Sequence, residues 1–559
     1  MFFVTFLAQP LMSLFRSGIL VGIGTLLSRI TGLIREILIA SVFGTSNNAD
    51  MVNIALKLPN LFRRIFAEGA LSSVFIPMLE KKKKLIIEEQ SVSKQENSYK
   101  LSPTNIQSSD YSNAQFFFQN INIWLCAILI SFISIITIFM KPLMLIIAPG
   151  FIKYADKIEQ TTFLCRITLP YLFFISISAL WGGVLNSENK FFPFAFVPCL
   201  LNISIIFFTL ILIPYISPSK AISISVIIGG GVQLLFMYFF IRQTNFKIKI
   251  HKPILNNDVI SFFKNMVPVT ISASIIQLNL FISQSIASFA TGAISILSYA
   301  DRIYQLPLSL IGTTLSTILL PELSKLNHLN HEQSMKVKNN ALKFAYILAI
   351  PSSVGLFSLN TPIVELLYQR GAFTLLDTIN TAKAISVFCL GIPAFILHKV
   401  YTSILYSHMN IKPMLKITIY SLIINITVNI ILVSQLSYIG IALGSVVAGW
   451  YNTIALHRIV MKHQYLSISK KCIAFFIKVL LISLAMGFIV KTQYEFIYTN
   501  ISTYNIIARY PKTLMLINSK MYNLICTVTC ITTGIIIYAF GLILTKTVTL
   551  KNKRIQIVD

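Results

Sequence analysis

Apolar stretches of about 20 residues recur along almost the whole chain, and this hydrophobicity restricts it to one class of fold. Of the 559 residues, 55% are hydrophobic and only 12% are charged, with a mean hydropathy of +0.75. No soluble globular protein of this length has that balance. About 20 apolar residues in a helix span the hydrocarbon core of a bilayer. We therefore predict an all-α polytopic membrane protein.

Hydropathy windows predict about 14 transmembrane helices. An even number puts both termini on one side of the membrane, and most loop lysines and arginines fall on the side of the termini. Because basic loops stay in the cytoplasm, both termini are predicted to be cytoplasmic. The formal charge of +27 then needs no nucleic-acid partner. The predicted spans lie near residues 17–43, 50–79, 116–147, 161–185, 193–213, 221–241, 260–290, 294–323, 341–358, 380–406, 414–434, 438–460, 472–490 and 521–545.

An internal repeat divides the chain. The segment Ala70–Lys81 (ALSSVFIPMLEK) aligns without gaps on Thr314–Lys325 (TLSTILLPELSK), and Leu58-Pro59 corresponds to Leu306-Pro307. The repeated segments run in the same direction, which predicts two six-helix lobes about a central cavity. We assign residues 1–243 and 244–465 to the lobes and 466–559 to two extra C-terminal helices with a tail. Residues 81–115 are predicted to be a flexible cytoplasmic loop, and 491–520 an outer loop.

The stretch from Ser28 to Leu79 combines membrane-like hydropathy with many charges. A charge at the centre of a membrane helix costs at least about 2.5–3.5 kcal/mol, so such residues face a wet cavity or one another. On a helical wheel Asp50, Lys57, Arg64 and Glu68 share one face, although Pro59 should bend that helix. One reading is ion pairs that lock two helices together. Because the cations outnumber the acids five to three, some of the positive charge needs an external anionic partner. The charged residues of the stretch are Arg29, Arg35, Glu36, Asp50, Lys57, Arg63, Arg64 and Glu68.

No catalytic or cofactor motif accompanies these charges. The sequence has no phosphate-binding loop with its lysine, no nucleophile elbow and no metal-binding His-Glu-x-x-His, and the seven cysteines read as core residues. We thus expect no metal site, no cofactor and no enzyme. Guanidinium groups offer bidentate donors that suit a diphosphate. A carrier working by alternating access could use Arg29, Arg35, Arg63, Arg64 and Arg302 as ligands, while Asp50, Glu68 and Asp301 hold the arginines.

Several motifs together resemble one transporter family. They are the run Ser28–Glu36 (SRITGLIRE), Ala49-Asp50, the block Lys57–Ala70 (KLPNLFRRIFAEGA), and Tyr299–Arg302. The chain is similar in these motifs to the MurJ (MviN) lipid II flippases of the multidrug/oligosaccharidyl-lipid/polysaccharide exporter (MOP) superfamily. The resemblance covers most of the chain.

The resemblance implies a function and a site. A monomeric carrier would move undecaprenyl-diphosphate-MurNAc-pentapeptide-GlcNAc from the inner to the outer leaflet for cell wall synthesis, with membrane lipids around it. The two C-terminal helices would form a groove for the lipid tail. The family's cavity arginines map onto Arg29, Arg35, Arg63 and Arg302, and the matching acids are Glu36, Asp50 and Glu68.

Two departures from the family pattern leave questions open. Gln305 stands where some relatives carry an acid, and the eleventh predicted helix has Asn425 and Asn429 where certain sodium-binding relatives have a carboxylate. The coupled ion is thus either Na⁺ or none, with the membrane potential as the other source of energy. A polysaccharide-lipid or drug exporter of the same superfamily, and a structural or signalling membrane protein, are the alternative functions.

Overall fold

The computed structural model describes residues 2–65, 71, 73–83, 103–249, 251–329, 331–410, 412–467, 470–503, 512–551 and 554–557. By its internal contacts the chain forms two compact units. The first unit comprises residues 1–39 and 47–285, and the second comprises residues 40–46 and 286–559. The short connection at residues 40–46 therefore belongs to a different unit from the helices that it joins.

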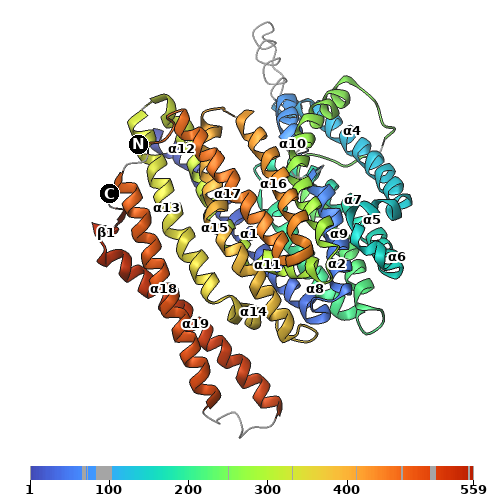
Figure 1. Ribbon diagram of the computed structural model, residues 1–559. Coiled ribbons are helices and arrows are strands. Elements are labelled where there is room, and N and C mark those ends of the chain that lie inside the picture. The colour runs from blue at the N-terminus through green and yellow to red at the C-terminus, as the bar shows by residue number, and fades with distance from the viewer. Residues whose placement is uncertain are drawn as a thin grey trace. The chain divides into compact units, whose positions relative to one another are not determined.

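The first unit is helical throughout its described elements (Figure 1). Helices α8 and α9 pack against each other, and α7 lies against both α4 and α9. The elements are α1 (Phe2–Phe43, ending in the second unit), α2 (Asn47–Arg63), α4 (Pro103–Ile138), α5 (Met140–Ile147), the 3-10 turn η2 (Pro149–Lys153), α6 (Ala155–Thr168), α7 (Tyr171–Ser187), α8 (Phe192–Leu212), α9 (Pro218–Ile241) and α10 (Asn257–Ala287).

The second unit contains longer helices and one small sheet. Helix α15 lies against α13 and α17, and α18 packs on α13 and α19. Its elements are α11 (Ala293–Pro307), the π-helical η3 (Leu308–Thr313), α12 (Thr314–Leu329), α13 (His331–Ser358), α14 (Asn360–Tyr368), α15 (Leu375–Ser407), α16 (Lys412–Leu436), α17 (Tyr438–Lys462), α18 (Lys470–Thr503), α19 (Lys512–Leu544), β1 (Val548–Lys551) and β2 (Arg554–Ile557).

Eleven helices of the described residues are long and apolar enough to cross a membrane. Each lies at one of the 14 predicted positions. The other three predicted spans overlap with α1, α2 and α10, although α2 ends at Arg63, before the end of its predicted span. Helix α2 has only 17 residues, and the predicted part of α1 carries three charged side chains. The structure thus supports an all-α polytopic membrane protein at this coarser level.

The helix boundaries reproduce the internal repeat. Helix α2 begins at Asn47 and α11 at Ala293, 246 residues later. Both helices give way to π-helical turns, at residues 64–65 and again at Leu308–Thr313. Since a π-helical turn changes the angle per residue, a single wheel drawn from Asp50 to Glu68 does not describe α2 and its continuation. Of the four residues predicted to share one face, only Asp50 and Lys57 lie within α2, which ends at Arg63.

Three details differ from the sequence-based expectation. Helices α18 and α19 extend to Thr503 and from Lys512, so most of the predicted outer loop 491–520 is helix. Helix α4 starts at Pro103, inside the predicted flexible loop 81–115. The C-terminal strands β1 and β2 pair antiparallel, with Val548 opposite Ile557, in a chain predicted to be all-α. Hydropathy reports apolar content, which is why it missed helical extensions of mixed polarity and this short hairpin.

The core of the first unit is built from aromatic rings. Phe75 and Phe117 stack with centroids 5.8 Å apart, and Phe262 meets Phe75 edge to face at 6.3 Å. All three side chains are buried. In the same core, Trp181 donates its indole N–H to Asn122 Oδ1 at 3.0 Å. The hydrogen bond satisfies the one polar atom that this large side chain takes into the core.

Candidate functional site

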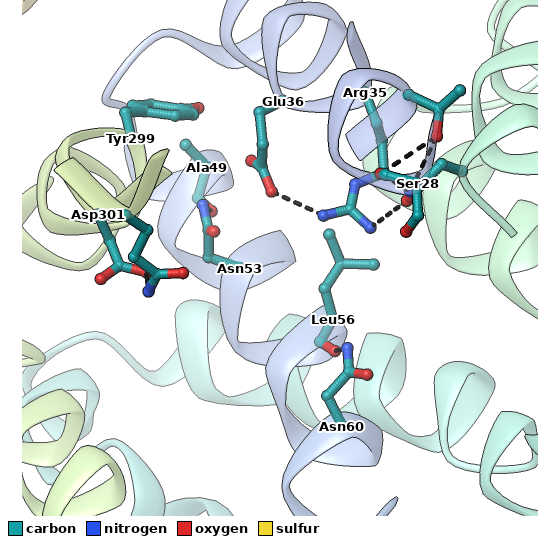
Figure 2. A network of polar contacts seen from close by, with 12 residues as sticks. Ser28, Arg35, Glu36, Ala49, Asn53, Leu56, Asn60, Tyr299 and Asp301 are labelled. Atoms are coloured by element: carbon teal, nitrogen blue, oxygen red, sulfur yellow. Dashed lines mark hydrogen bonds and ion pairs between the residues drawn. The ribbon is translucent and has the colours of Figure 1, made fainter. Parts of the chain in front are cut away.

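Arg35 is held by polar partners inside the first unit (Figure 2). On α1 its Nη2 forms an ion pair with Glu36 Oε1 at 2.7 Å, and Nη1 donates to Asn202 Oδ1 on α8 at 3.0 Å. The two charged side chains are only 11% and 4% exposed. A buried arginine needs such partners because an unpaired charge there costs several kcal/mol. Arg35 and Glu36 therefore neutralise each other within α1, and this pair does not join two helices.

Asn202 connects the two helices. Its Nδ2 donates to the carbonyl oxygen of Ser28 at 3.1 Å and to Thr31 Oγ1 at 3.3 Å, while its oxygen accepts from Arg35. A Cβ on Gly32 would lie 3.3 Å from the Asn202 amide nitrogen. The glycine of the Ser28–Glu36 motif thus makes room for an asparagine that satisfies Arg35.

Asp50 has a lysine partner that the sequence did not suggest. Lys157 Nζ, at the start of α6, lies 3.6 Å from Asp50 Oδ2 and donates to Asn47 Oδ1 at 2.7 Å. The same ammonium lies 3.8 Å from the centroid of the Phe151 ring. Asp50 is fully buried and Lys157 is 7% exposed. The pair ties the start of α2 to α6.

The remaining charges of the stretch are more exposed. Arg29 and Lys57 are half-buried, and so is Arg63, whose Nε donates to Asn60 Oδ1 at 3.1 Å. Arg64 is exposed in the π-helical turn after α2. Asn60 itself donates to the carbonyl oxygen of Leu56 at 2.9 Å, and Figure 2 shows this pair. Glu68, the last of the predicted acids, lies outside the described residues.

In the second unit the predicted charges lie on α11. Asp301 is half-buried and accepts a hydrogen bond from Gln305 Nε2 at 2.5 Å, one helical turn later. Arg302 is exposed. Gln305, which replaces an acid of some relatives, therefore engages Asp301.

The connection between α1 and α2 is built into the second unit. We call residues 41–45 the docked loop. Ala372 N donates to the Ser41 carbonyl oxygen at 2.7 Å, and the buried Tyr299 hydroxyl donates to the Gly44 carbonyl oxygen at 2.9 Å. The Thr45 hydroxyl donates to the Asp377 carboxylate, which also closes the capping box of α15. Each partner comes from a different part of the second unit.

Glycines make this close approach possible. Gly44, Gly292 and Gly371 all adopt the left-handed conformation, with φ of +57°, +73° and +59°. A Cβ on Gly371 would lie 2.2 Å from the Ser41 carbonyl oxygen, and one on Gly292 would lie 2.6 Å from that of Thr45. No L-residue fits these positions unless the docked loop moves.

Sequence reasoning missed the partner residues Lys157, Asn202 and Asp377. Lys157 was counted among the outer-loop lysines, although a buried Asp50 near the same predicted side required a cation. Asn202 gave no signal beyond being a polar residue in an apolar span. Among the described residues, no cluster of three or more His, Cys, Asp or Glu side chains could hold a metal ion.

Comparison with known proteins gives one family. The family model described as "Lipid II flippase MurJ" matches residues 39–511. A "Probable lipid II flippase MurJ" of Rickettsia prowazekii is 46% identical over 497 residues, covering 87% of this chain and 92% of the relative. The "Lipid II flippase MurJ" of Burkholderia cenocepacia is 32% identical over 455 residues, and the match covers 80% of this chain and 83% of that relative.

Solved structures agree with this result. The structure titled "Lipid II flippase MurJ, inward closed conformation" has a TM-score of 0.72 and 27% identity, covering 94% of this chain and 99% of the other. An inward-facing multidrug resistance MATE family transporter of the MOP superfamily has a TM-score of 0.60 at 14% identity, covering 80% and 95%, and shows the fold alone. From the matched residues, the identities and the fold, this chain belongs to the MurJ family of lipid II flippases.

Proposed function

We propose that this chain transports lipid II from the inner to the outer leaflet of the bacterial inner membrane by alternating access. The observation that carries the proposal is its family membership together with arginines on membrane helices. Arg29 lies on α1, about 21 Å along the helix from its end at Phe43. Arg302 lies within the membrane span Ala293–Leu326.

The arginines of the predicted set divide by exposure. Arg35 is buried against Glu36 and Asn202. We propose that in this arrangement it positions other residues of the site. Arg29, Arg63, Arg64 and Arg302 are more exposed, and we propose that they bind the diphosphate of the substrate. Lys57, Asp50, Glu68 and Asp301 are proposed ion-pairing or gating residues. Both the N-terminal and the C-terminal lobe contribute arginines, as a carrier built from two repeats requires.

The proposal also includes the division into lobes, the position of the termini and the oligomeric state. We propose lobes at residues 1–243 and 244–465, a C-terminal helix pair at 466–559 that holds the lipid tail, cytoplasmic termini and a monomeric carrier. Asn429 Nδ2 donates to Asn425 Oδ1 at 2.5 Å on α16. Since α16 offers these two amides and no carboxylate, a coupled sodium ion and the membrane potential both stay proposed energy sources.

The test measures lipid II in the outer leaflet of cells whose only lipid II flippase is this chain. Wild type should restore outer-leaflet lipid II, whereas Arg63→Ala and Arg302→Ala should abolish it with membrane insertion intact. Arg166→Ala is the matched control, because Arg166 is an exposed arginine on α6 whose Nε donates to the Thr137 carbonyl oxygen at 3.1 Å. Its activity should stay within about twofold of wild type.

Further outcomes separate the alternatives. Replacement of Arg63 or Arg302 by lysine should also impair transport, because lysine cannot offer a bidentate pair of donors. Full activity of the Arg63→Ala/Arg302→Ala double variant would refute the arginine site. Failure of a correctly inserted wild type would refute lipid II as the substrate and favour a polysaccharide-lipid or drug exporter.

A further inference from the structure

The segment that joins α9 to α10 is tied to the side of α4. We call residues 242–256 the basic strap. Gln119 Nε2 donates to the Lys247 carbonyl oxygen at 2.8 Å. The buried Asn120 amide makes two bonds to Ile254, donating to its carbonyl oxygen at 2.6 Å and accepting from its N–H at 3.0 Å. Trp124 Nε1 donates to the same carbonyl oxygen at 3.2 Å.

One side of the strap packs into the core of the first unit. Phe246 is 1% exposed and meets the Phe118 ring edge to face at 5.8 Å, and Ile248 packs on the same core. Side chains alternate between two sides in an extended segment. Lys247 and Lys249 accordingly point the other way, and both are exposed. The packing therefore fixes which side of the strap carries its charges.

The outward side of the strap is cationic and has no acid to balance it. Residues 242–257 contain one arginine and three lysines and neither Asp nor Glu. The next acid in the sequence, Asp258, is paired with Lys82 at 2.8 Å. Within the described parts of the chain, Lys247, Lys249 and Lys252 form no ion pair. Three exposed ammonium groups thus gather on a fixed backbone.

Exposed apolar side chains adjoin these lysines beside the first turns of the apolar span of α4. Ile254 is 47% exposed and Leu255 is 63% exposed. The strap contacts α4 between Phe116 and Trp124, and the apolar span of α4 begins at Asn113. Tryptophans are typical of the interface between lipid and water. Basic residues beside exposed aliphatic ones at this level are the pattern of an interfacial lipid contact.

We propose that the basic strap binds the headgroups of anionic phospholipids in the leaflet where α4 enters the membrane. Lys247, Lys249 and Lys252 contact the phosphates, and Ile254 and Leu255 reach the acyl chains below them. Loop lysines also orient membrane proteins during insertion, but that role needs neither a pinned backbone nor apolar side chains beside the charges. Each lysine near an anionic surface contributes about fivefold to affinity at moderate salt.

The test uses the purified full-length protein in mixed micelles with equal amounts of phosphatidylglycerol and phosphatidylcholine. The lipids that remain bound after gel filtration are quantified. Wild type should retain phosphatidylglycerol at least about threefold over phosphatidylcholine, and K247Q/K249Q/K252Q should lower that ratio to about one. The control K412Q/K416Q/K462Q removes three exposed lysines from the same predicted side and should keep the wild-type ratio.

Two more measurements test the proposal even if the glutamine triple variant fails to fold. K247R/K249R/K252R keeps the charge and should keep the preference. The preference of wild type should fall several-fold as NaCl rises from about 0.05 to 0.5 M, because salt screens exposed charges. The proposal is overturned by an absent or salt-independent preference in wild type, by an equal loss in the control triple, or by displacement of the lipid with millimolar pyrophosphate, which would indicate a free-anion site.

Discussion

At the scale of single residues, the charges in the membrane helices of the first unit fall into two groups. Arg35 with Glu36, and Asp50 with Lys157, are buried ion pairs. Arg29, Arg63 and Arg64 are more exposed. Removing one member of a buried pair leaves the other charge without its partner, which costs about 3–5 kcal/mol. Variants of the paired residues thus report stability as well as transport, and variants of the exposed arginines report transport more directly.

The substitution Asn202→Leu tests the arrangement around Arg35. Leucine leaves Arg35 Nη1 without its acceptor in a buried place, so the free energy of unfolding should fall by about 1–3 kcal/mol. Denaturant or thermal unfolding of the purified protein in detergent measures it. Asn265→Leu is the control, because Asn265 is exposed on α10, and it should change stability by less than about 0.5 kcal/mol. Equal stability of the two variants would contradict the role of Asn202.

Glu365 on α14 makes stability depend on pH. It lies beyond the span Glu332–Ser358, and burial raises its pKa, partly offset by a hydrogen bond from the Asn523 side chain. The folded protein therefore binds this proton more tightly than the unfolded chain does. The contribution of Glu365 to the free energy of unfolding is therefore fully present below the ordinary glutamate pKa of about 4.3. This contribution is lost as the pH rises through the higher pKa of the folded state.

Glu365→Gln should remove this dependence. The variant should gain stability relative to wild type between about pH 4 and pH 8, with little difference at the acidic end. Unfolding curves of both proteins at pH 4, 6 and 8 measure the gap. A gap of the same size at every pH would show that the carboxyl group does not titrate differently in the folded state.

At the scale of elements, the docked loop is a connection held by hydrogen bonds from the second unit. Ser41, Gly44 and Thr45 each bind a different segment, the last of them through the capping residue Asp377 of α15. Left-handed glycines lie on both sides of these contacts. A shift of α11 or α15 within the second unit would therefore have to break contacts with the docked loop.

Gly371→Ala should loosen the docked loop. Alanine in the left-handed conformation costs about 1–2 kcal/mol, and its Cβ would clash with the Ser41 carbonyl oxygen. Amide hydrogen exchange at residues 41–46 should become at least about tenfold faster. Gly231→Ala on α9 is the control, since nothing lies within 4 Å of its added Cβ. Unchanged exchange in Gly371→Ala would mean that the loop does not depend on this approach.

At the scale of the whole molecule, the basic residues predict how the chain crosses the membrane. In a cysteine-free background, Ser217→Cys between α8 and α9 should react with an impermeant maleimide added outside the cell. Gln243→Cys in the basic strap should react only after the membrane is opened. Labelling of Gln243→Cys from outside would reverse the predicted orientation and would move the basic strap to the other leaflet.

The sequence predicted the positions of the helices well and the contacts between them poorly. Each apolar stretch reports its own environment, so hydropathy located the spans, and the alignment of the halves anticipated the 246-residue offset of α2 and α11. The partners of Arg35 and Asp50 depend on which helices pack together. Asn202 lies 167 residues from Arg35, and nothing in one sequence links the two.

The membrane arginines themselves were identified from the sequence because charge is rare in apolar stretches. Their division into buried and exposed groups needed coordinates, since Arg35 and Arg29 lie on the same helix and differ only in what faces them. The π-helical turns at residues 64–65 and 308–313 were also unpredictable, because a wheel assumes one angle per residue throughout.

The docked loop also has a consequence for biogenesis. Residues 41–45 leave the ribosome about 250 residues before Gly292, and more than 320 before the partners at Ala372 and Asp377. The first two helices can enter the membrane early, but their connection reaches its final contacts only after α15 has been synthesised. A nascent chain that stops before α15 therefore keeps this connection open to proteases and chaperones.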